Sequence, residues 1–146
     1  MNNLVLVDGS FEELTKITLL KTLNYLEVKN SSISVLFTDD TEMRELNKKY
    51  RGKDKSTDVL SFSMREGEDF PKTEKGNLGD IVISIDYATR QAKEFEVSLD
   101  DEIKRLLVHG CLHLLGYEHE DVSVDVARKM FDKQEEILSL LRDLGA

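Results

Sequence analysis

The stretch Ile103-Lys-Arg-Leu-Leu-Val-His109-Gly-Cys-Leu-His113-Leu-Leu-Gly116-Tyr-Glu-His119 predicts a central helix that ends in a turn. Its apolar residues recur at the three- and four-residue spacing of one helix face, and others lie around the rest of the circumference. A helix that is apolar on most sides is buried against other elements. Gly116 follows the periodic stretch and can adopt the positive φ that ends a helix and reverses the chain. We therefore expect the fold to be built around this helix.

All three histidines of the chain lie in this stretch. His109 and His113 are four residues apart, so a helix projects both from one face, one turn apart. A reversal at Gly116 would bring His119 back toward them. Three neutral imidazoles and a water are the ligand set of a catalytic zinc. The spacing therefore predicts a metal site at these three residues, with a histidine-lined helix end or histidines that contact RNA as the alternatives.

A metal held in this way would serve hydrolysis. Zinc bound by three neutral ligands keeps its full charge and lowers the pKa of a bound water to about 7. Imidazole also suits other divalent transition metals, so zinc is a preference. A structural zinc is less favoured, because such sites often use cysteines, and the only cysteine lies on another side of the helix from the histidines. That residue, Cys111, is expected to be a packed core thiol.

The residue after the first histidine separates this motif from metalloprotease signatures. In H-E-x-x-H that residue is the glutamate that acts as general base, whereas here it is Gly110. A base would have to come from elsewhere, and Glu102 could instead orient a metal ligand. The missing glutamate argues against an ordinary peptidase and favours phosphoryl chemistry, in which positioning and charge neutralisation carry most of the barrier. The candidate bases are Glu102, Glu118, Asp58 and Asp80.

Length and composition indicate one soluble domain over residues 1–146. The chain is 40% hydrophobic and 34% charged, which is enough for a single core. One cysteine excludes an internal disulfide, as is usual in a reducing compartment. The N-terminus lacks the pattern of a signal peptide, and no apolar stretch approaches the length of a membrane span. A cytoplasmic location is therefore expected.

The net charge of −9 argues against general coating of nucleic acid. Residues 48–55 nevertheless contain five basic residues and one acidic residue. Such a patch in an acidic protein can bind phosphate locally. On charge alone, a solvated lysine-rich loop is the favoured interpretation.

Hydrophobic periodicity and turn residues divide the rest of the chain into strands and helices. The candidate helix caps are Ser10, one of residues 39–41, Ser98, and Asp121 or Ser123. The polar residues 64–78 are expected to form a surface loop. The order β-α-β-α-β-β-α-α-α predicts an α+β domain with about four strands in a sheet packed on the histidine helix. The strands are expected at residues 4–7, 34–38, 57–63 and 80–85, and the other helices at 11–28, after 39–41, at 86–96 and at 124–143.

At the level of motifs, His109-Gly-x-Leu-His113-Leu-Leu-Gly-Tyr-x-His119 resembles the signature of the YbeY family of ribosomal RNA maturation factors and single-strand endoribonucleases. Upstream, Leu46-Asn-x-x-Tyr50-Arg51-Gly-Lys-Asp54 with Thr57-Asp-Val-Leu-Ser-Phe62, and Leu78-Gly-Asp-Ile-x-Ile-Ser84, resemble two further blocks of that family. The resemblance covers about residues 40–120. It implies a zincin-like α+β fold, a metal held by His109, His113 and His119, and RNA processing at the ends of ribosomal RNA.

The resemblance also implies a role for Arg51 in RNA handling and activity, with ribosomal RNA or ribosomal particles as partners. A guanidinium at this position can clamp a phosphate. Three positions depart from the family pattern. Ser56 and Ser63 stand where family members usually have proline, and Glu118 stands where they have aspartate. The first two affect loop rigidity, and the third weakens any role assigned to that carboxylate.

Overall fold

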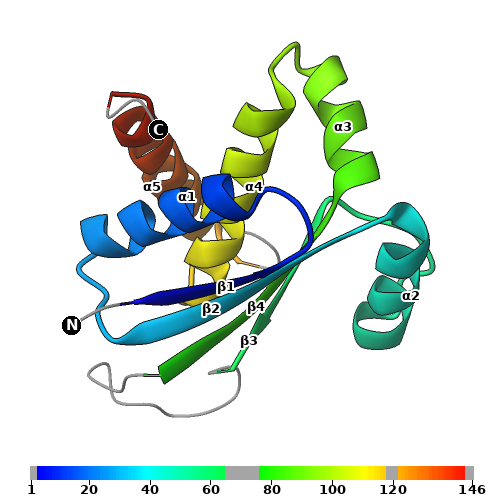
Figure 1. Ribbon diagram of the computed structural model, residues 1–146, viewed down its shortest axis with the longest axis horizontal. Helices are drawn as coiled ribbons and strands as arrows, with labels where there is room; N and C mark the ends of the chain where they lie inside the picture. Colours follow the sequence, from blue (N-terminus) through cyan, green and yellow to red (C-terminus); the bar gives the residue numbers. More distant parts are fainter. Residues whose placement is uncertain (1–2, 65–75, 118–121, 144–146) are drawn as a thin grey trace.

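Four strands and five helices form the described part of the chain, residues 3–64, 76–117 and 122–143 of a computed structural model (Figure 1). The architecture is α+β, as predicted, with one mixed sheet. The elements are β1 (Leu4–Asp8), α1 (Glu12–Tyr25), β2 (Ser31–Thr38), α2 (Asp40–Arg51), β3 (Val59–Ser63), β4 (Gly76–Ser84), α3 (Ile85–Glu94), α4 (Leu99–Leu114) and α5 (Val124–Asp143).

The sheet has the strand order β1-β2-β4-β3. β1, β2 and β4 run parallel, and β3 pairs antiparallel with β4 at the end of the sheet. A bulge between Ser32 and Ile33 lets the β2–β4 pairing extend through polar residues to Ser31 and Gly76. β2 and β4 therefore begin earlier than predicted, because backbone pairing extends them where their side chains carry no strand pattern.

Alternation along the strands gives the sheet two different faces. The inner face packs against α1 and α4 and holds the main core, which includes Ile33, Val35, Ile81 and Ile83. α2 packs on the opposite face, where Met43 meets Leu60 and Val82. Figure 1 shows α1, α4 and α5 together above the sheet, with α2 apart from them. The described helices include none that is both long and apolar enough to cross a membrane.

α4 is the central helix that the sequence predicts. Nine of its residues are buried, and it contacts α1, α3, α5 and the sheet. The hydroxyl of Ser98 accepts a hydrogen bond from the backbone N–H of Asp101 at 3.0 Å, which confirms the predicted cap. α5 adds a second core on the other side of α4, where Val108 and Leu112 meet Met130 and Ile137. α4 is thus held from several sides.

Three details differ from the sequence prediction. Ser10 does not cap α1: the helix begins after Phe11, whose φ is 60° and whose ring packs 5.5 Å from that of Phe37. Residues 48–51 belong to α2 and not to a loop, because the helix continues until Gly52 ends it at a φ of 70°. Residues 76–78 belong to β4, while residues 65–75 of the predicted loop lie outside the described residues.

Candidate metal centre

His109 and His113 lie one turn apart on α4, as predicted. Their ring centroids are 5.0 Å apart, with 74° between the ring planes. Both side chains are half-buried, so the pair stands at the rim of the core and not within it. A rigid, well-packed helix fixes the spacing of the two imidazoles. Among the described residues, no group of three histidine, cysteine, aspartate or glutamate side chains is arranged to hold a metal. His119 is outside those residues.

The turn after α4 is the predicted reversal at Gly116. The φ of Gly116 is +100°, a value that residues with a Cβ rarely adopt. Its N–H donates to the carbonyl of His113 at 3.0 Å, and the N–H of Tyr117 donates to that of Leu112 at 3.0 Å. These two bonds satisfy carbonyls at the helix end and turn the chain away from the helix axis.

Gln134 of α5 lies within hydrogen-bond distance of the first histidine. Its Oε1 lies 2.8 Å from Nδ1 of His109, and only 5% of the residue is exposed. The sequence motifs do not identify this residue. The available signal was a polar residue in the apolar stripe of α5: Gln134 lies four residues after Met130 and three before Ile137, both of which are buried. A buried amide in such a stripe needs a polar partner.

Gly110 lies where α4 touches the sheet. A Cβ on Gly110 would lie 3.1 Å from two carbon atoms of Ile81, which is tighter than ordinary van der Waals contact. The position that carries glutamate in metalloproteases is therefore occupied here by a close helix–sheet contact. A side chain at this position would require Ile81 to shift, so the packing favours glycine here.

Two of the four candidate bases belong to an ion-pair cluster. Glu102 is 1% exposed and receives two hydrogen bonds from the guanidinium of Arg105, at 2.8 and 2.6 Å. This pairing raises the pKa of Arg105, although burial opposes the rise. Asp58 lies 3.8 Å from the same guanidinium and accepts a hydrogen bond from the N–H of Val59. Both carboxylates thus have structural partners, while Gln134 lies within hydrogen-bond distance of His109.

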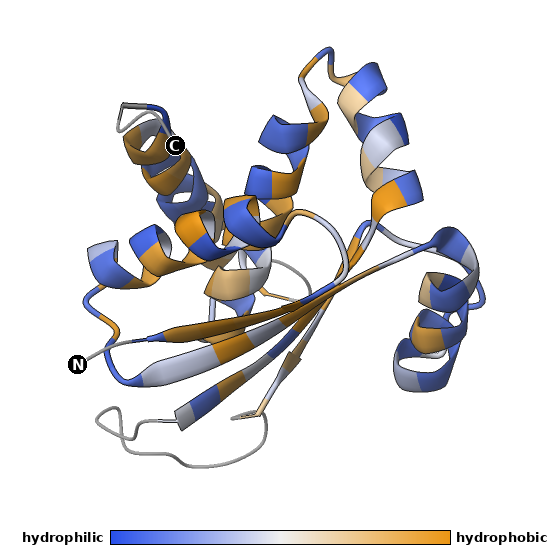
Figure 2. Cartoon of the chain, viewed as in Figure 1, coloured by the Kyte–Doolittle hydropathy of each residue, from blue (hydrophilic) through white to orange (hydrophobic). Residues whose placement is uncertain are grey.

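Asp80 lies on the other face of the sheet. It alternates with the inward-facing Ile81 and lines a groove of about 650 Å³ between β1 and α2. Leu6 also lines the groove and is 53% exposed, on a strand that Figure 2 shows as hydrophobic along most of its length. Asp80 is therefore separated from the histidine helix by the sheet. Glu118, the fourth candidate, lies outside the described residues.

Arg51 reaches the edge strand of the sheet from the end of α2. Its Nη2 donates to the backbone oxygen of Ser61 at 2.7 Å, and its guanidinium lies 5.5 Å from the centroid of the Phe62 ring. At the two ends of β3, Asp58 and Met64 form backbone hydrogen bonds with β4. In an antiparallel pair, the backbone groups of alternate residues point toward and away from the partner strand, so the carbonyl of Ser61 points away from β4. The guanidinium therefore lies at the outer rim of β3 and is exposed to solvent.

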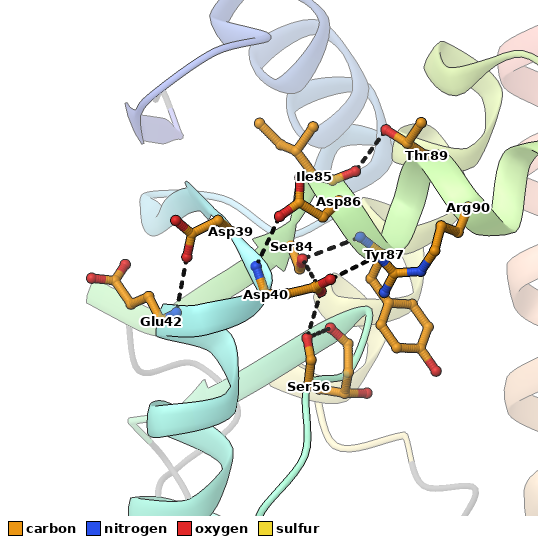
Figure 3. A network of polar contacts seen from close by, with 11 residues as sticks. Asp39, Asp40, Glu42, Ser56, Ser84, Ile85, Asp86, Tyr87, Thr89 and Arg90 are labelled. Atoms are coloured by element: carbon orange, nitrogen blue, oxygen red, sulfur yellow. Dashed lines mark hydrogen bonds and ion pairs between the residues drawn. The ribbon is translucent and has the colours of Figure 1, made fainter.

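A polar clasp at the other end of α2 holds this helix in place (Figure 3). Oδ1 of Asp40 accepts hydrogen bonds from Ser56 at 2.7 Å and from Ser84 at 2.9 Å, and its Oδ2 lies 2.7 Å from Nη1 of Arg90. The hydrogen bond from Arg90 is the main cause that lowers the pKa of Asp40 to about 2. Ser56, where the family usually has proline, thus anchors the segment between α2 and β3 by its hydroxyl.

Cys111 is a core thiol, as expected. It is fully buried among the residues of the inner core. Burial raises its pKa to about 12, so the thiol stays protonated at neutral pH. It does not share the half-buried face of the two histidines.

Known proteins resemble this chain in sequence and in fold. The sequence model described as endoribonuclease YbeY matches residues 3–142. A protein of Persephonella marina named endoribonuclease YbeY is 48% identical over 122 residues, which is 84% of this chain and 78% of that protein. One of Aquifex aeolicus with the same name is 58% identical over 98 residues, 67% of this chain and 63% of that protein. The solution structure of TM1509 from Thermotoga maritima matches with a TM-score of 0.64 at 27% identity, over 93% of this chain and 86% of that one.

Proposed function

This chain belongs to the endoribonuclease YbeY family, and from that membership we propose that it is a metal-dependent endoribonuclease. Its substrate is single-stranded RNA, and its role is the maturation of ribosomal RNA. The observation that carries the proposal is the pair of imidazoles on one face of a rigid helix, in a chain that matches this family along nearly its whole length. Residues 1–146 act as one hydrolase domain, in the cytoplasm and in contact with ribosomal particles.

The metal ligands in this proposal are His109, His113 and His119. The first two fit such a site, because they are neighbours on one helix face and Gln134 already engages Nδ1 of His109. The turn at Gly116 supports the third, because it redirects the chain immediately before the segment that holds His119. Imidazole ligands suit zinc best, and another divalent transition metal second. A bound metal of this kind supplies Lewis acidity and an activated water.

Arg51 has the role of binding a phosphate of the RNA. One of its N–H groups holds the Ser61 carbonyl, which fixes the guanidinium at the rim of the edge strand. A guanidinium has five N–H donors, so the exposed group can still donate to phosphate oxygens. Lys48 and Lys49 of the same helix turn add positive charge nearby. The sequence-based preference for a solvated loop thus gives way to a role in binding the RNA backbone.

Two rival functions make different predictions. A zinc hydrolase acting on a peptide or small molecule needs a base near the histidines. The close contact at Gly110 and the partners of Glu102 and Asp58 disfavour that function. A ribosome-assembly factor whose metal only braces the turn would bind ribosomal particles without cutting RNA.

The test is cleavage of a single-stranded RNA by the purified full-length chain, with and without a chelator. We expect cleavage that the chelator removes and that zinc or another divalent metal restores. His113→Ala should abolish cleavage without unfolding the protein. Arg51→Ala should slow it by about 100-fold, the lower end of the range for loss of one charge-stabilising donor, because the guanidinium is exposed to solvent. Lys49→Ala, in the same helix turn, is the matched control and should slow it less.

The outcomes separate the three functions. Hydrolysis of peptides or esters with RNA untouched would support the small-molecule hydrolase. Unfolding of the His113→Ala variant, together with binding of ribosomal particles and no RNA cleavage by the native protein, would support the assembly factor. Equal RNA cleavage by wild type and by an Arg51→Ala, His113→Ala double variant would show that the nuclease is a contaminant.

A further inference from the structure

The apolar contact between α4 and α5 contains one buried amide. Gln134 lies among Met130, Ile137 and Leu138 on α5, which face Val108 and Leu112 of α4. Burial of an amide in such surroundings is unfavourable unless the amide is hydrogen bonded. Gln134 is 5% exposed, and its Oε1 lies 2.8 Å from Nδ1 of His109. A leucine or methionine would pack there without an unfavourable polar group, so the glutamine indicates a role beyond packing.

The chemistry of this contact fixes the proton on the histidine ring. An amide carbonyl oxygen only accepts hydrogen bonds. With Oε1 of Gln134 facing the ring, Nδ1 of His109 is the nitrogen that carries the proton and donates it. In the neutral ring the lone pair is then left on Nε2, the nitrogen on the far side of the ring from α5. Without Gln134, this acceptor would no longer favour the proton on Nδ1.

The packing of α5 on α4 determines where Gln134 lies. α5 begins at Val124, and its apolar face packs against α4, which brings Gln134 beside His109. A neutral acceptor has a second consequence, because it adds no negative charge beside the site. A metal held by three imidazoles then keeps its full charge.

We propose that Gln134 is a positioning residue for the metal centre: its carbonyl oxygen holds His109 in the Nδ1–H tautomer and aims Nε2 at the metal. This inference rests on the proposed function, since it takes His109 as a ligand. Partners of this type typically change metal affinity by 10- to 100-fold when they are removed.

The test compares the full-length wild type with three single variants. Gln134→Met keeps the length of the side chain and removes the acceptor. Gln134→Glu keeps an acceptor oxygen in the same place and serves as the rescue variant. Gln91→Met is the matched control, because Gln91 is the only other glutamine and accepts a hydrogen bond from Arg105 and not from a histidine. Circular dichroism and thermal melts establish that each variant is folded.

Two readouts are measured. In the metal-free protein, ¹⁵N chemical shifts of the His109 ring report which nitrogen is protonated. We expect Nδ1–H in the wild type, in Gln134→Glu and in Gln91→Met, and a mixture in Gln134→Met. Zinc affinity is then measured by competition with a chromophoric chelator. We expect Gln134→Met to bind zinc about 10- to 100-fold more weakly, while Gln134→Glu and Gln91→Met bind at least nearly as tightly as the wild type.

Two results would overturn the inference. One is a wild-type His109 that carries its proton on Nε2. The other is a folded Gln134→Met variant that binds zinc as tightly as the wild type. Failure of the proposed function looks different: no variant, the wild type included, would bind zinc, while the ring of His109 would still show the Nδ1–H form set by Gln134.

Discussion

Removal of the negative charge from Asp40 should loosen the clasp that holds α2 against the rest of the fold. Asp40→Asn keeps the size of the side chain, yet it eliminates the ion pair with Arg90 and leaves an amide that can accept only through one oxygen. In the wild type, Oδ1 of Asp40 accepts hydrogen bonds from the hydroxyls of Ser56 and Ser84, and Ser84 is fully buried. We expect a modest loss of stability and a weaker hold on the segment that follows α2.

The size of the loss follows from the environment of the carboxylate. The difference between its ordinary pKa of 3.8 and its pKa of about 2 in the folded protein corresponds to at most about 2.4 kcal/mol. The side chain of Asp40 is 33% exposed and that of Arg90 is 58% exposed, so solvent screens the interaction. We therefore expect about 1 kcal/mol, or a fall of about 2–4 °C in melting temperature for a chain of this size.

The pH dependence gives the sharper test. Because folding lowers the pKa of Asp40, its charged form stabilises the protein above pH 3.8, and this contribution disappears as the pH falls through about 2. Urea unfolding of wild type and Asp40→Asn should thus differ by a constant amount from pH 5 to 7, and the difference should shrink below pH 3.8 and vanish only below about pH 2. Asp39→Asn is the matched control, since asparagine and aspartate cap helices about equally well.

Either of two results would refute this reasoning. A difference between wild type and Asp40→Asn that persists unchanged to pH 2.5 would mean that charge is not its origin. Equal stabilities at pH 7, with Asp39→Asn as destabilising as Asp40→Asn, would mean that the clasp contributes nothing specific. A parallel assay of RNA cleavage at pH 7 would show whether the clasp also affects activity through the segment beside Arg51.

Three further outcomes are expected. Gly79→Ala should destabilise the protein by more than about 3 kcal/mol, because its Cβ would lie 2.2 Å from a backbone oxygen of β3 at a φ of +140°. Gly52→Ala, which has open space around it, should cost about 1 kcal/mol, and chemical denaturation measures both losses. Arg105→Met should cost about 2–4 kcal/mol by leaving the carboxylate of Glu102 buried without its partner, and the added change Glu102→Gln should recover much of that loss in a double-mutant cycle. Cys111 should resist iodoacetamide at pH 8 in the folded protein and react on unfolding, as measured by mass spectrometry; rapid labelling without denaturant would contradict its burial.

The sequence by itself determined the elements that depend on local pattern. The apolar periodicity of residues 103–115 predicted α4, Ser98 predicted its cap, and Gly116 predicted the positive φ of the turn, because each of these depends on the chain within a few residues. The spacing of His109 and His113 placed both on one face for the same reason. The resemblance to the YbeY family also rested on such short motifs, and the comparisons confirmed it.

Only the tertiary structure decided which distant groups meet. Gln134 reaches His109 across 25 residues, Arg105 of α4 meets Asp58 beside β3, and the sheet separates Asp80 from the histidines. No local pattern encodes these pairs, because they depend on the packing angle of α5 on α4 and on the register of β3 with β4. The predicted end of α2 was wrong for a related reason. A lysine-rich turn is polar, and only the hydrogen bonds that the backbone N–H groups of Gly52 and Lys53 donate to the last turn show that the turn is helical.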